Sequence, residues 1–298
     1  MNAFRIPCKV HGHVGSSFRA SSAKGSRAIS VGQTADWDAS QYLRFADERT
    51  RPSRDLVAAI PLQNPKNIID LGCGPANSTA VLASRYPSSR STRIRGIDSS
   101  PDMLRKAREV LPAADFELAD LAIWEPPQGN EAADLLFTNA TLQWLPAELI
   151  LPIIEKWVKS QPSGGVFAMQ VPDNVTEPSH VLMAETASAG PWAGLLSQKS
   201  PGRSIFPRPN TLYDRMQPLC RNIDIWHTYY QHRLDGHEAI VSWFKQSGLR
   251  PYLQPLEKDM QKTFLQNYLE SIKAAYPLNK DGSVLLRFPR LFMVCVRS

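Results

Sequence analysis

Short hydrophobic runs alternate along the first half of the chain with segments in which hydrophobic residues recur every three or four positions. The runs predict buried strands at residues 67–71, 93–98, 114–118, 133–138 and 164–170. The periodic segments predict helices at residues 53–60, 77–86, 100–111 and 149–160. Because strands that alternate with helices are joined by crossover connections, this pattern predicts a parallel, doubly wound α/β sheet.

The second half of the chain follows a different pattern, in which helical stretches interrupt the last two strands. We expect helices near residues 178–188, 236–247 and 257–275, and strands near residues 222–229 and 288–296. A helical insertion at the carboxyl ends of parallel strands would cover the position where such sheets bind ligands. We therefore expect a core at about 53–172 and a helical cap inserted within about 173–285.

A strand, a tight turn and a helix start meet at residues 68–77. The strand ends in Asp70, and Gly72 and Gly74 would let a ligand approach the backbone closely. The next strand ends at Asp98, whose carboxylate can accept hydrogen bonds from both hydroxyls of a ribose. A dinucleotide motif would have a glycine in place of Asn77, and Asp70 would repel a pyrophosphate. The motif therefore favours a cationic nucleoside ligand over a dinucleotide, and the alternative is an ordinary glycine-rich turn.

This combination of residues resembles motif I of the class I S-adenosylmethionine-dependent methyltransferases, although the family's third glycine is Ala76 here. The resemblance implies a Rossmann-like, seven-stranded sheet and S-adenosylmethionine as the cofactor. It also implies that the methionine end of the cofactor, its ribose and its adenine are bound by Asp70, Gly72, Gly74, Asn77, Asp98, Ser99, Asp120, Leu121 and Asn139.

Segments outside this motif narrow the resemblance to the trans-aconitate 2-methyltransferase family. The similar segments are residues 36–45, 48–52, 170–174, 177–183, 224–230, 248–253 and 288–292. Residues 1–35 have no counterpart in that family, the connection at 88–95 is longer and basic, and residues 189–210 diverge. The resemblance implies esterification of one carboxylate of a small polycarboxylic acid.

Such a reaction needs cations more than it needs a general base. A carboxylate nucleophile is already ionised at pH 7, and the planar fork of arginine suits the carboxylates that do not react. The candidate substrate-binding residues are Arg49, Arg51, Arg290, Arg250, His180, Tyr229 and Trp144. Arg290 stands out because it lies in an apolar strand, where a charge must find a partner. The alternative for each arginine is a solvated charge or a structural ion pair.

The net charge of +6 is concentrated at the N-terminus, so it does not predict nucleic-acid binding. Residues 1–35 contain five basic residues and no acidic ones, and removing these five from 34 leaves 29 basic residues against 28 acidic ones. A basic, serine-rich segment without a long apolar run predicts a mitochondrial transit peptide. The alternatives are a disordered tail or an upstream start codon that is not used, with the protein in the cytoplasm. No apolar run is long enough to span a membrane.

The four cysteines show no C-x-x-C pairing, so neither a zinc site nor a disulfide framework is predicted. The preferred hypothesis is an enzyme that methylates a small polycarboxylate, and the family resemblance implies that this acid is trans-aconitate. Two alternatives stay open: methylation of a fatty or carrier-bound acid, and a mitochondrial assembly factor that keeps the cofactor fold. The sequence leaves the oligomeric state open.

Overall fold

A computed structural model describes residues 46–87, 92–199, 205–245 and 247–298. These residues all belong to one compact unit. The predicted transit peptide at residues 1–35 lies outside the described residues. Within the described part of the chain, no helix is long and apolar enough to cross a membrane.

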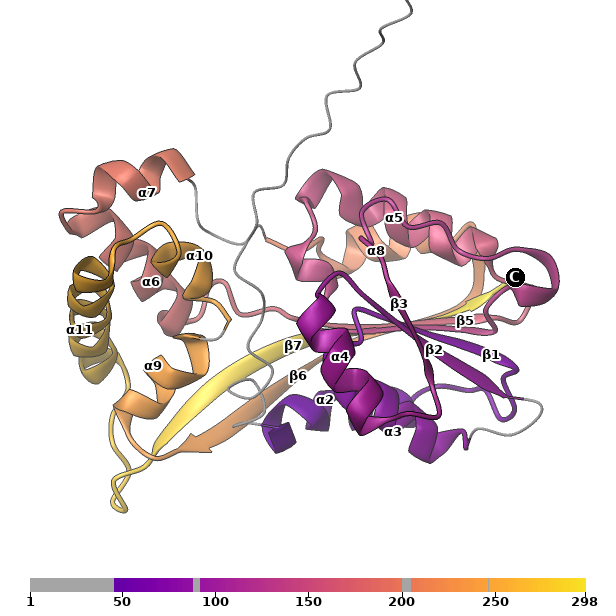
Figure 1. The fold of residues 1–298 in the computed structure, drawn as a ribbon, viewed down its shortest axis with the longest axis horizontal. Coiled ribbons are helices and arrows are strands. Elements are labelled where there is room, and N and C mark those ends of the chain that lie inside the picture. Colours follow the sequence, from indigo (N-terminus) through magenta and orange to yellow (C-terminus); the bar gives the residue numbers. More distant parts are fainter. Residues whose placement is uncertain (1–45, 88–91, 200–204, 246) are drawn as a thin grey trace, which may run out of the picture. The chain divides into compact units, whose positions relative to one another are not determined.

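The described strands form one seven-stranded mixed sheet in the order β3-β2-β1-β4-β5-β7-β6 (Figure 1). They are β1 (Asn67–Leu71), β2 (Arg93–Asp98), β3 (Asp115–Leu118), β4 (Leu135–Asn139), β5 (Val166–Pro172), β6 (Cys220–Leu234) and β7 (Val284–Arg297). The first five strands pair in parallel, and β7 runs antiparallel to both β5 and β6. The predicted doubly wound, seven-stranded sheet is therefore confirmed.

Two hydrophobic layers cover the two faces of the sheet, because successive residues of a strand point to opposite faces. Ile68 of β1 packs in one layer with Leu56 and Leu82, and its neighbour Ile69 packs in the other with Ile154 and Leu212. The first layer is formed with α2 (Ala46–Ala58) and α3 (Asn77–Arg85). The second is formed with α5 (Ala147–Ser160) and α8 (Pro209–Met216).

The starts of two helices differ in how well the sequence predicts them. Helix α4 (Pro101–Val110) begins as its sequence predicts: the Ser100 hydroxyl accepts from the Met103 amide at 3.2 Å, and Pro101 occupies the first turn. Helix α2 begins at Ala46 rather than near residue 53, so Pro52 lies inside it. A proline in a helix removes one backbone hydrogen bond, and here the helix continues through it.

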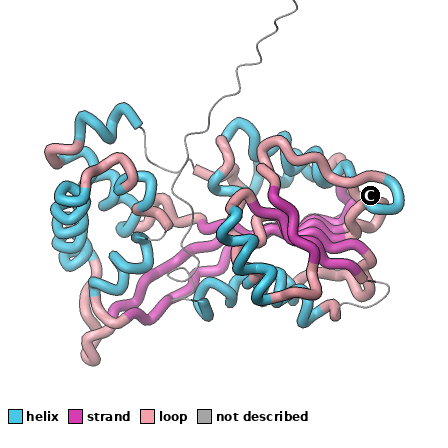
Figure 2. The backbone as a smooth tube through the Cα atoms, viewed as in Figure 1, coloured by secondary structure: helices cyan, strands magenta, loops and turns pink. Residues whose placement is uncertain are grey.

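A cap of helices packs on the far halves of β6 and β7 (Figures 1 and 2). It contains α6 (Pro178–Ala189), α7 (Ala193–Lys199), α9 (His237–Lys245), α10 (Arg250–Leu253) and α11 (Lys258–Ala275). Sequence periodicity did not predict α7, α8, α10 or the short 3-10 helices η2 (Gly129–Glu131) and η3 (Leu142–Trp144).

Strands β6 and β7 are longer than predicted, and the additional residues carry the cap. In β6, Tyr230, His232 and Leu234 are buried while the residues between them are exposed, so the alternation of a half-buried strand continues to residue 234. The polar His232 interrupts the hydrophobic pattern, which explains why the sequence indicated an earlier end. The longer strands extend the sheet beyond β5.

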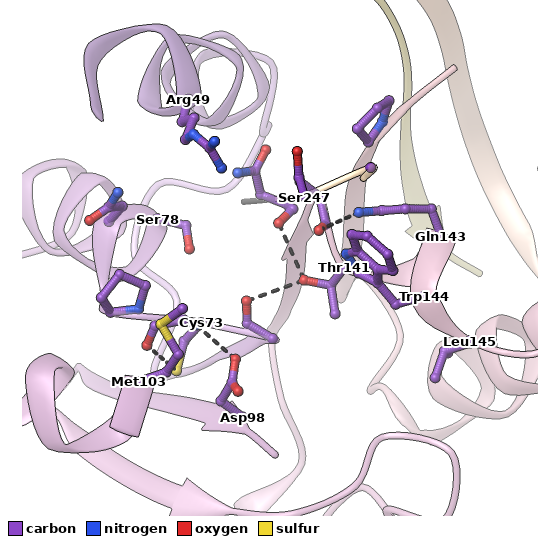
Figure 3. Close-up of a pocket in the computed structure, with 18 of the residues that line it drawn as sticks. Arg49, Cys73, Ser78, Asp98, Met103, Thr141, Gln143, Trp144, Leu145 and Ser247 are labelled. Atoms are coloured by element: carbon purple, nitrogen blue, oxygen red, sulfur yellow. Dashed lines mark hydrogen bonds between the residues drawn. The ribbon is translucent and has the colours of Figure 1, made fainter. Parts of the chain in front are cut away.

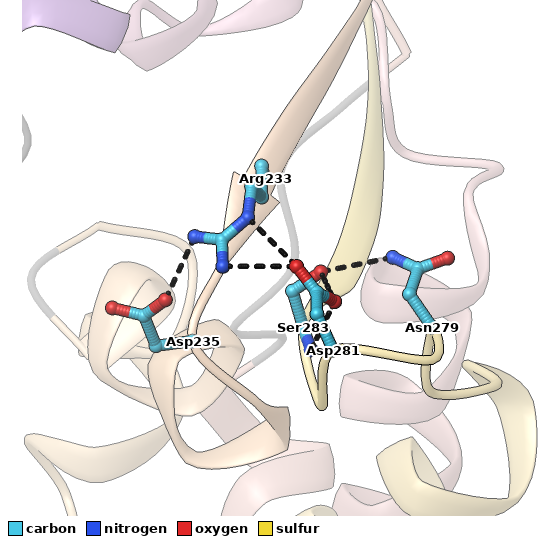
Figure 4. A network of polar contacts seen from close by, with 5 residues as sticks. All are labelled: Arg233, Asp235, Asn279, Asp281 and Ser283. Carbon is cyan, nitrogen blue, oxygen red and sulfur yellow. Dashed lines mark hydrogen bonds and ion pairs between the residues drawn. The ribbon is translucent and has the colours of Figure 1, made fainter.

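A polar network joins the far ends of β6 and β7 (Figure 4). Arg233 donates to Asp235 at 2.9 Å and to Asp281 at 3.1 Å. Asn279 donates to the Ser283 hydroxyl at 3.1 Å, and hydrogen bonds from Ser283, with the charge of Arg233, lower the pKa of Asp281 to about 2. The network connects the segments through which the chain enters and leaves the α9–α11 insertion.

Candidate active site

A cavity of about 300 Å³ lies at the carboxyl ends of β1, β2, β4 and β5 and is bordered by residues of the cap (Figure 3). Of the residues predicted to bind the cofactor, it is lined by Gly72, Gly74, Asn77, Asp98, Ser99, Asp120, Leu121 and Asn139. Of those predicted to bind the substrate, it is lined by Arg49, Trp144, His180 and Arg290. The lining does not include Asp70, Arg51, Arg250 or Tyr229.

The turn between β1 and α3 brings bare backbone to the cavity. Gly72 and Gly74 have φ values of 77° and 54°, which side chains other than glycine rarely adopt. A Cβ on Gly72 would lie 2.2 Å from the Thr141 side chain, whereas a Cβ on Gly74 would meet no atom within 4 Å. Gly72 therefore permits close contact with the exit of β4, and Gly74 leaves room on the cavity side for a ligand.

Asp70 does not line the cavity, which differs from the contact expected of it. Its side chain is fully buried and accepts hydrogen bonds from the hydroxyls of Ser78 and Thr79, both at 2.7 Å. Burial raises the pKa of Asp70 to about 6, although these two hydrogen bonds oppose the shift. Asp70 therefore fixes the start of α3 from inside the protein, and through it the position of Ser78 in the cavity lining.

Asp98 is the acid at the opposite end of the cavity from Arg49 in Figure 3. Its two carboxylate oxygens accept from the backbone amides of Gly74 and Ser100, each at 2.9 Å. A carboxylate oxygen can accept more than one hydrogen bond, so these contacts orient the group and leave it able to accept from hydroxyls. The glycine turn and the acid that follows β2 are thus fixed to each other directly.

Two asparagines supply buried polar atoms that have no partner within the protein. The side-chain nitrogen of Asn77 and the side-chain oxygen of Asn139 are both buried and make no hydrogen bond. Both residues line the cavity. Because an unsatisfied buried polar group costs about 1–3 kcal/mol, these atoms are suited to a ligand that carries both an acceptor and a donor.

Arg290 is the most deeply buried charge that lines the cavity, with a side chain only 3% exposed. Its guanidinium carbon lies 4.6 Å from the centre of the Phe288 ring and 6.0 Å from that of Tyr230. One of its terminal nitrogens donates to the side-chain oxygen of Gln170 at 3.1 Å. The faces of aromatic rings attract cations, so these contacts hold the guanidinium in place.

Arg49 and His180 line the same cavity from α2 and α6. The guanidinium carbon of Arg49 lies 5.3 Å from the Trp243 ring, and its terminal nitrogen donates to the Trp243 carbonyl at 3.4 Å. The ring of His180 meets Phe244 edge-on, at 4.9 Å between centres. Both side chains are therefore positioned by aromatic residues of α9.

Three predicted substrate residues are not part of the cavity lining. Arg51 is exposed and lies over the Tyr230 ring at 5.1 Å. Tyr229 is 55% exposed, because adjacent residues of a strand face opposite sides and Tyr230 is the buried one. Arg250 begins α10 and does not line the cavity.

Sequence reasoning predicted His180 of the cap but missed four other cap residues that line the cavity, namely Trp243, Phe244, Ser247 and Gly248. Two adjacent aromatic residues in a helical pattern are typical of a protein core, and nothing in their spacing indicates a ligand. The segment at 248–253 carried the only signal, through its similarity to the family.

Comparison with known proteins identifies the family. A model of the methyltransferase domain matches residues 68–165. A trans-aconitate 2-methyltransferase of Rhodopseudomonas palustris is 49% identical over 263 residues, which cover 88% of this chain and 100% of the relative. A trans-aconitate 2-methyltransferase of Afipia carboxidovorans has the same identity and coverage. The chain belongs to the trans-aconitate 2-methyltransferase family.

Solved structures support the fold of this family member. The YcgJ protein of Bacillus subtilis superposes with a TM-score of 0.52, covering 83% of this chain and 99% of the other, at 9% sequence identity. At that identity the likeness concerns the fold alone. The order of the strands and the antiparallel β7 are those of the class I methyltransferases.

The protein is thus an S-adenosylmethionine-dependent methyltransferase, and its cavity fits that cofactor. The space beside Gly74 admits a ligand against the backbone. The unsatisfied oxygen of Asn139 suits an ammonium group, and the unsatisfied nitrogen of Asn77 suits a carboxylate, which are the two charged groups of an amino acid. The carboxylate of Asp98, which lines the same cavity, is the type of acceptor that the hydroxyls of a ribose require.

We expect Asp98→Ala to weaken binding of S-adenosylhomocysteine by about 1.5–3 kcal/mol, or about 10- to 150-fold, since hydrogen bonds to a charged group contribute that much. Titration calorimetry measures the effect. Asp115→Ala is the matched control, because it removes an exposed acid of β3 that does not line the cavity. An Asp98 variant that folds and binds as tightly as the wild type would contradict the assignment to the ribose.

Proposed function

We propose that the protein transfers a methyl group from S-adenosylmethionine to one carboxylate of trans-aconitate and releases a monomethyl ester. The observation that carries this proposal is the distribution of charge in one cavity. The acids Asp98 and Asp120 border the part built from the β2 and β3 exits, and Arg49 and Arg290 border the part next to the cap. A cation-lined acceptor site beside a nucleoside site suits a polyanionic acceptor.

The residues of the core would hold the cofactor, which supplies a methyl group on a positively charged sulfur when it is bound. Asp98 would accept from the ribose, Asp120 and Leu121 would border the adenine, and Asn77 and Asn139 would bind the amino-acid end. These assignments rest on the cavity lining and on the unsatisfied atoms of the two asparagines.

The acceptor side would work by alignment. Arg290 and Arg49, with His180 beside them, would bind the carboxylates that do not react, which leaves the remaining carboxylate to face the methyl group. That carboxylate is ionised at neutral pH, so no side chain has to remove a proton. Holding two reactants in an attack geometry supplies much of the catalysis in a displacement of this kind.

Aromatic side chains would exclude water from the reacting atoms. The cavity is lined by Trp144, Trp243, Phe244 and Phe288. Removal of water strengthens the attraction between the arginines and the substrate carboxylates. A fatty acid would offer a single carboxylate and a long apolar chain, so two arginines in a cavity of about 300 Å³ favour a small polyacid.

The reaction itself is tested with purified protein, labelled S-adenosylmethionine and a panel of mono-, di- and tricarboxylic acids. We expect labelled product with trans-aconitate, and we expect base treatment to release the label, because esters are hydrolysed and N-methyl groups are not. Absence of turnover with trans-aconitate, alongside turnover of a fatty acid, would contradict the proposal.

We expect Arg290→Met to lower kcat/KM for trans-aconitate by about 100-fold, since a charge-assisted bidentate contact contributes roughly 3 kcal/mol. The affinity for S-adenosylhomocysteine should hardly change. Arg51→Met is the matched control, because Arg51 is exposed and does not line the cavity. If kcat/KM for trans-aconitate were the same in Arg290→Met as in Arg51→Met, Arg290 would not belong to the substrate site.

Residues 1–35 would act as a mitochondrial targeting segment and would direct the enzyme to the matrix. The support for this is their composition, with five basic residues and no acidic one. We expect the full chain to be imported and shortened by isolated mitochondria, and a chain that begins at Asp36 to stay outside while keeping its melting temperature and activity. Equal import of both chains, or loss of activity in the shorter one, would contradict this assignment.

A further inference from the structure

Gln170 is a polar residue in a position where sheet packing alone would favour an apolar one. It lies in β5 between Asn139 of β4 and Phe292 of β7, and its side chain is fully buried. Ala168, two residues earlier and on the same face of the strand, packs in the hydrophobic core. A buried amide costs free energy unless its atoms are bonded, so its contacts are informative.

The contacts of Gln170 join the two halves of the active site. Its side-chain oxygen accepts from Arg290 at 3.1 Å, and its backbone carbonyl accepts from the amide of Ala140 at 2.9 Å. Arg290 and Ala140 both line the cavity, whereas Gln170 does not. The side-chain nitrogen of Gln170 is buried and makes no hydrogen bond. Because a guanidinium can only donate, Arg290 determines which way the amide points.

Within the described residues, two aromatic rings and one amide contact the Arg290 guanidinium. The rings of Phe288 and Tyr230 contact the guanidinium, and the Tyr230 hydroxyl donates to Asp55. His232 stacks on Tyr230 at 5.8 Å, and burial, together with the charges of Arg290 and Arg51, lowers its pKa to about 4. His232 is therefore uncharged at neutral pH. An amide acceptor fits this pattern, because it orients the guanidinium without adding a negative charge.

We propose that Gln170 is a positioning and specificity-determining residue of the polycarboxylate site. Its neutral side chain fixes the direction of the Arg290 guanidinium without adding a negative charge beside it. A carboxylate at the same position would form the same hydrogen bond but would compete with the substrate for the cation. The inference rests on the proposed function, since it requires that Arg290 binds a carboxylate of the acceptor.

Two substitutions of similar size separate charge from structure. Gln170→Glu keeps an acceptor and adds a negative charge, whereas Gln170→Met removes the acceptor and adds none. We expect the KM for trans-aconitate to rise about 30-fold or more in Gln170→Glu and about 3- to 10-fold in Gln170→Met, since charged contacts contribute more than neutral ones. In both variants we expect kcat to stay within about 3-fold, because the reacting carboxylate and the cofactor contacts are untouched.

Titration calorimetry of trans-aconitate into protein saturated with S-adenosylhomocysteine measures the affinities directly. We expect the weakest binding in Gln170→Glu, intermediate binding in Gln170→Met and the tightest binding in the wild type. Gln217→Glu is the matched control, since it adds the same charge at an exposed position after α8. The melting temperature of Gln170→Glu should not fall below that of Gln170→Met. A purely structural role predicts the reverse order, with Met weaker than Glu, and that result would overturn the inference, as would wild-type affinity in both variants.

Arg290→Met in the same titration separates the role of Arg290 from the role of Gln170. If Arg290→Met binds trans-aconitate as tightly as the wild type, the assigned role of Arg290 fails and Gln170 cannot act through it. If Arg290→Met binds weakly and Gln170→Glu binds normally, only the inference about Gln170 is overturned. Should Gln170→Glu not fold, Gln170→Met decides, because an unchanged KM in that variant contradicts positioning.

Discussion

A guanidinium buried at the end of the central sheet is the constraint on which the acceptor half of this protein depends. Removing a charge from water costs several kcal/mol unless the protein replaces the lost hydration. Around Arg290, among the described residues, the replacement includes the rings of Phe288 and Tyr230 and the amide of Gln170. These groups come from β5, β6 and β7, so the cation is held where the extended strands leave the core and the cap begins.

The part of the cavity that would bind the methyl donor depends on backbone geometry, whereas the acceptor part depends on a buried charge. Gly72 allows the first turn to touch Thr141 at the exit of β4, and the buried Asp70 fixes the start of α3 by accepting hydrogen bonds from its first turn. Asp98 then joins the turn to the end of β2 through the amide of Gly74. The halves meet at the ends of β4 and β5, which are adjacent strands, and this adjacency brings a methyl donor and a polyacid into one cavity.

The sequence predicted the parts of this arrangement that are local. The glycine turn, Asp98 and the alternation of the first five strands follow from residues close together in the chain, and the structure contains them. The distinction between Arg49 and Arg51 was beyond such reasoning, because it depends on the phase of a helix. Two residues apart on a helix are about 200° apart around its axis, so only one of the two arginines can face the cavity.

Long-range packing explains the remaining differences. The burial of Tyr230 and His232 depends on helices inserted after β6. The sequence of β6 alone does not show that these helices cover this face of the strand. Asp70 was expected in the site because the motif places an acid there, but its side chain points to the helix start, where two hydroxyls bind it. In both cases the missing information is which face of a strand another element covers.

The central claim is that one cavity binds the methyl donor on the core side and a tricarboxylate on the cap side. A crystal structure with S-adenosylhomocysteine and trans-aconitate bound together tests it most directly. The account predicts the nucleoside at Asp98, two carboxylates of the acid on Arg290 and Arg49, and the third carboxylate facing the sulfur. A tricarboxylate bound outside this cavity, or bound within it without contacting Arg290, would contradict the account.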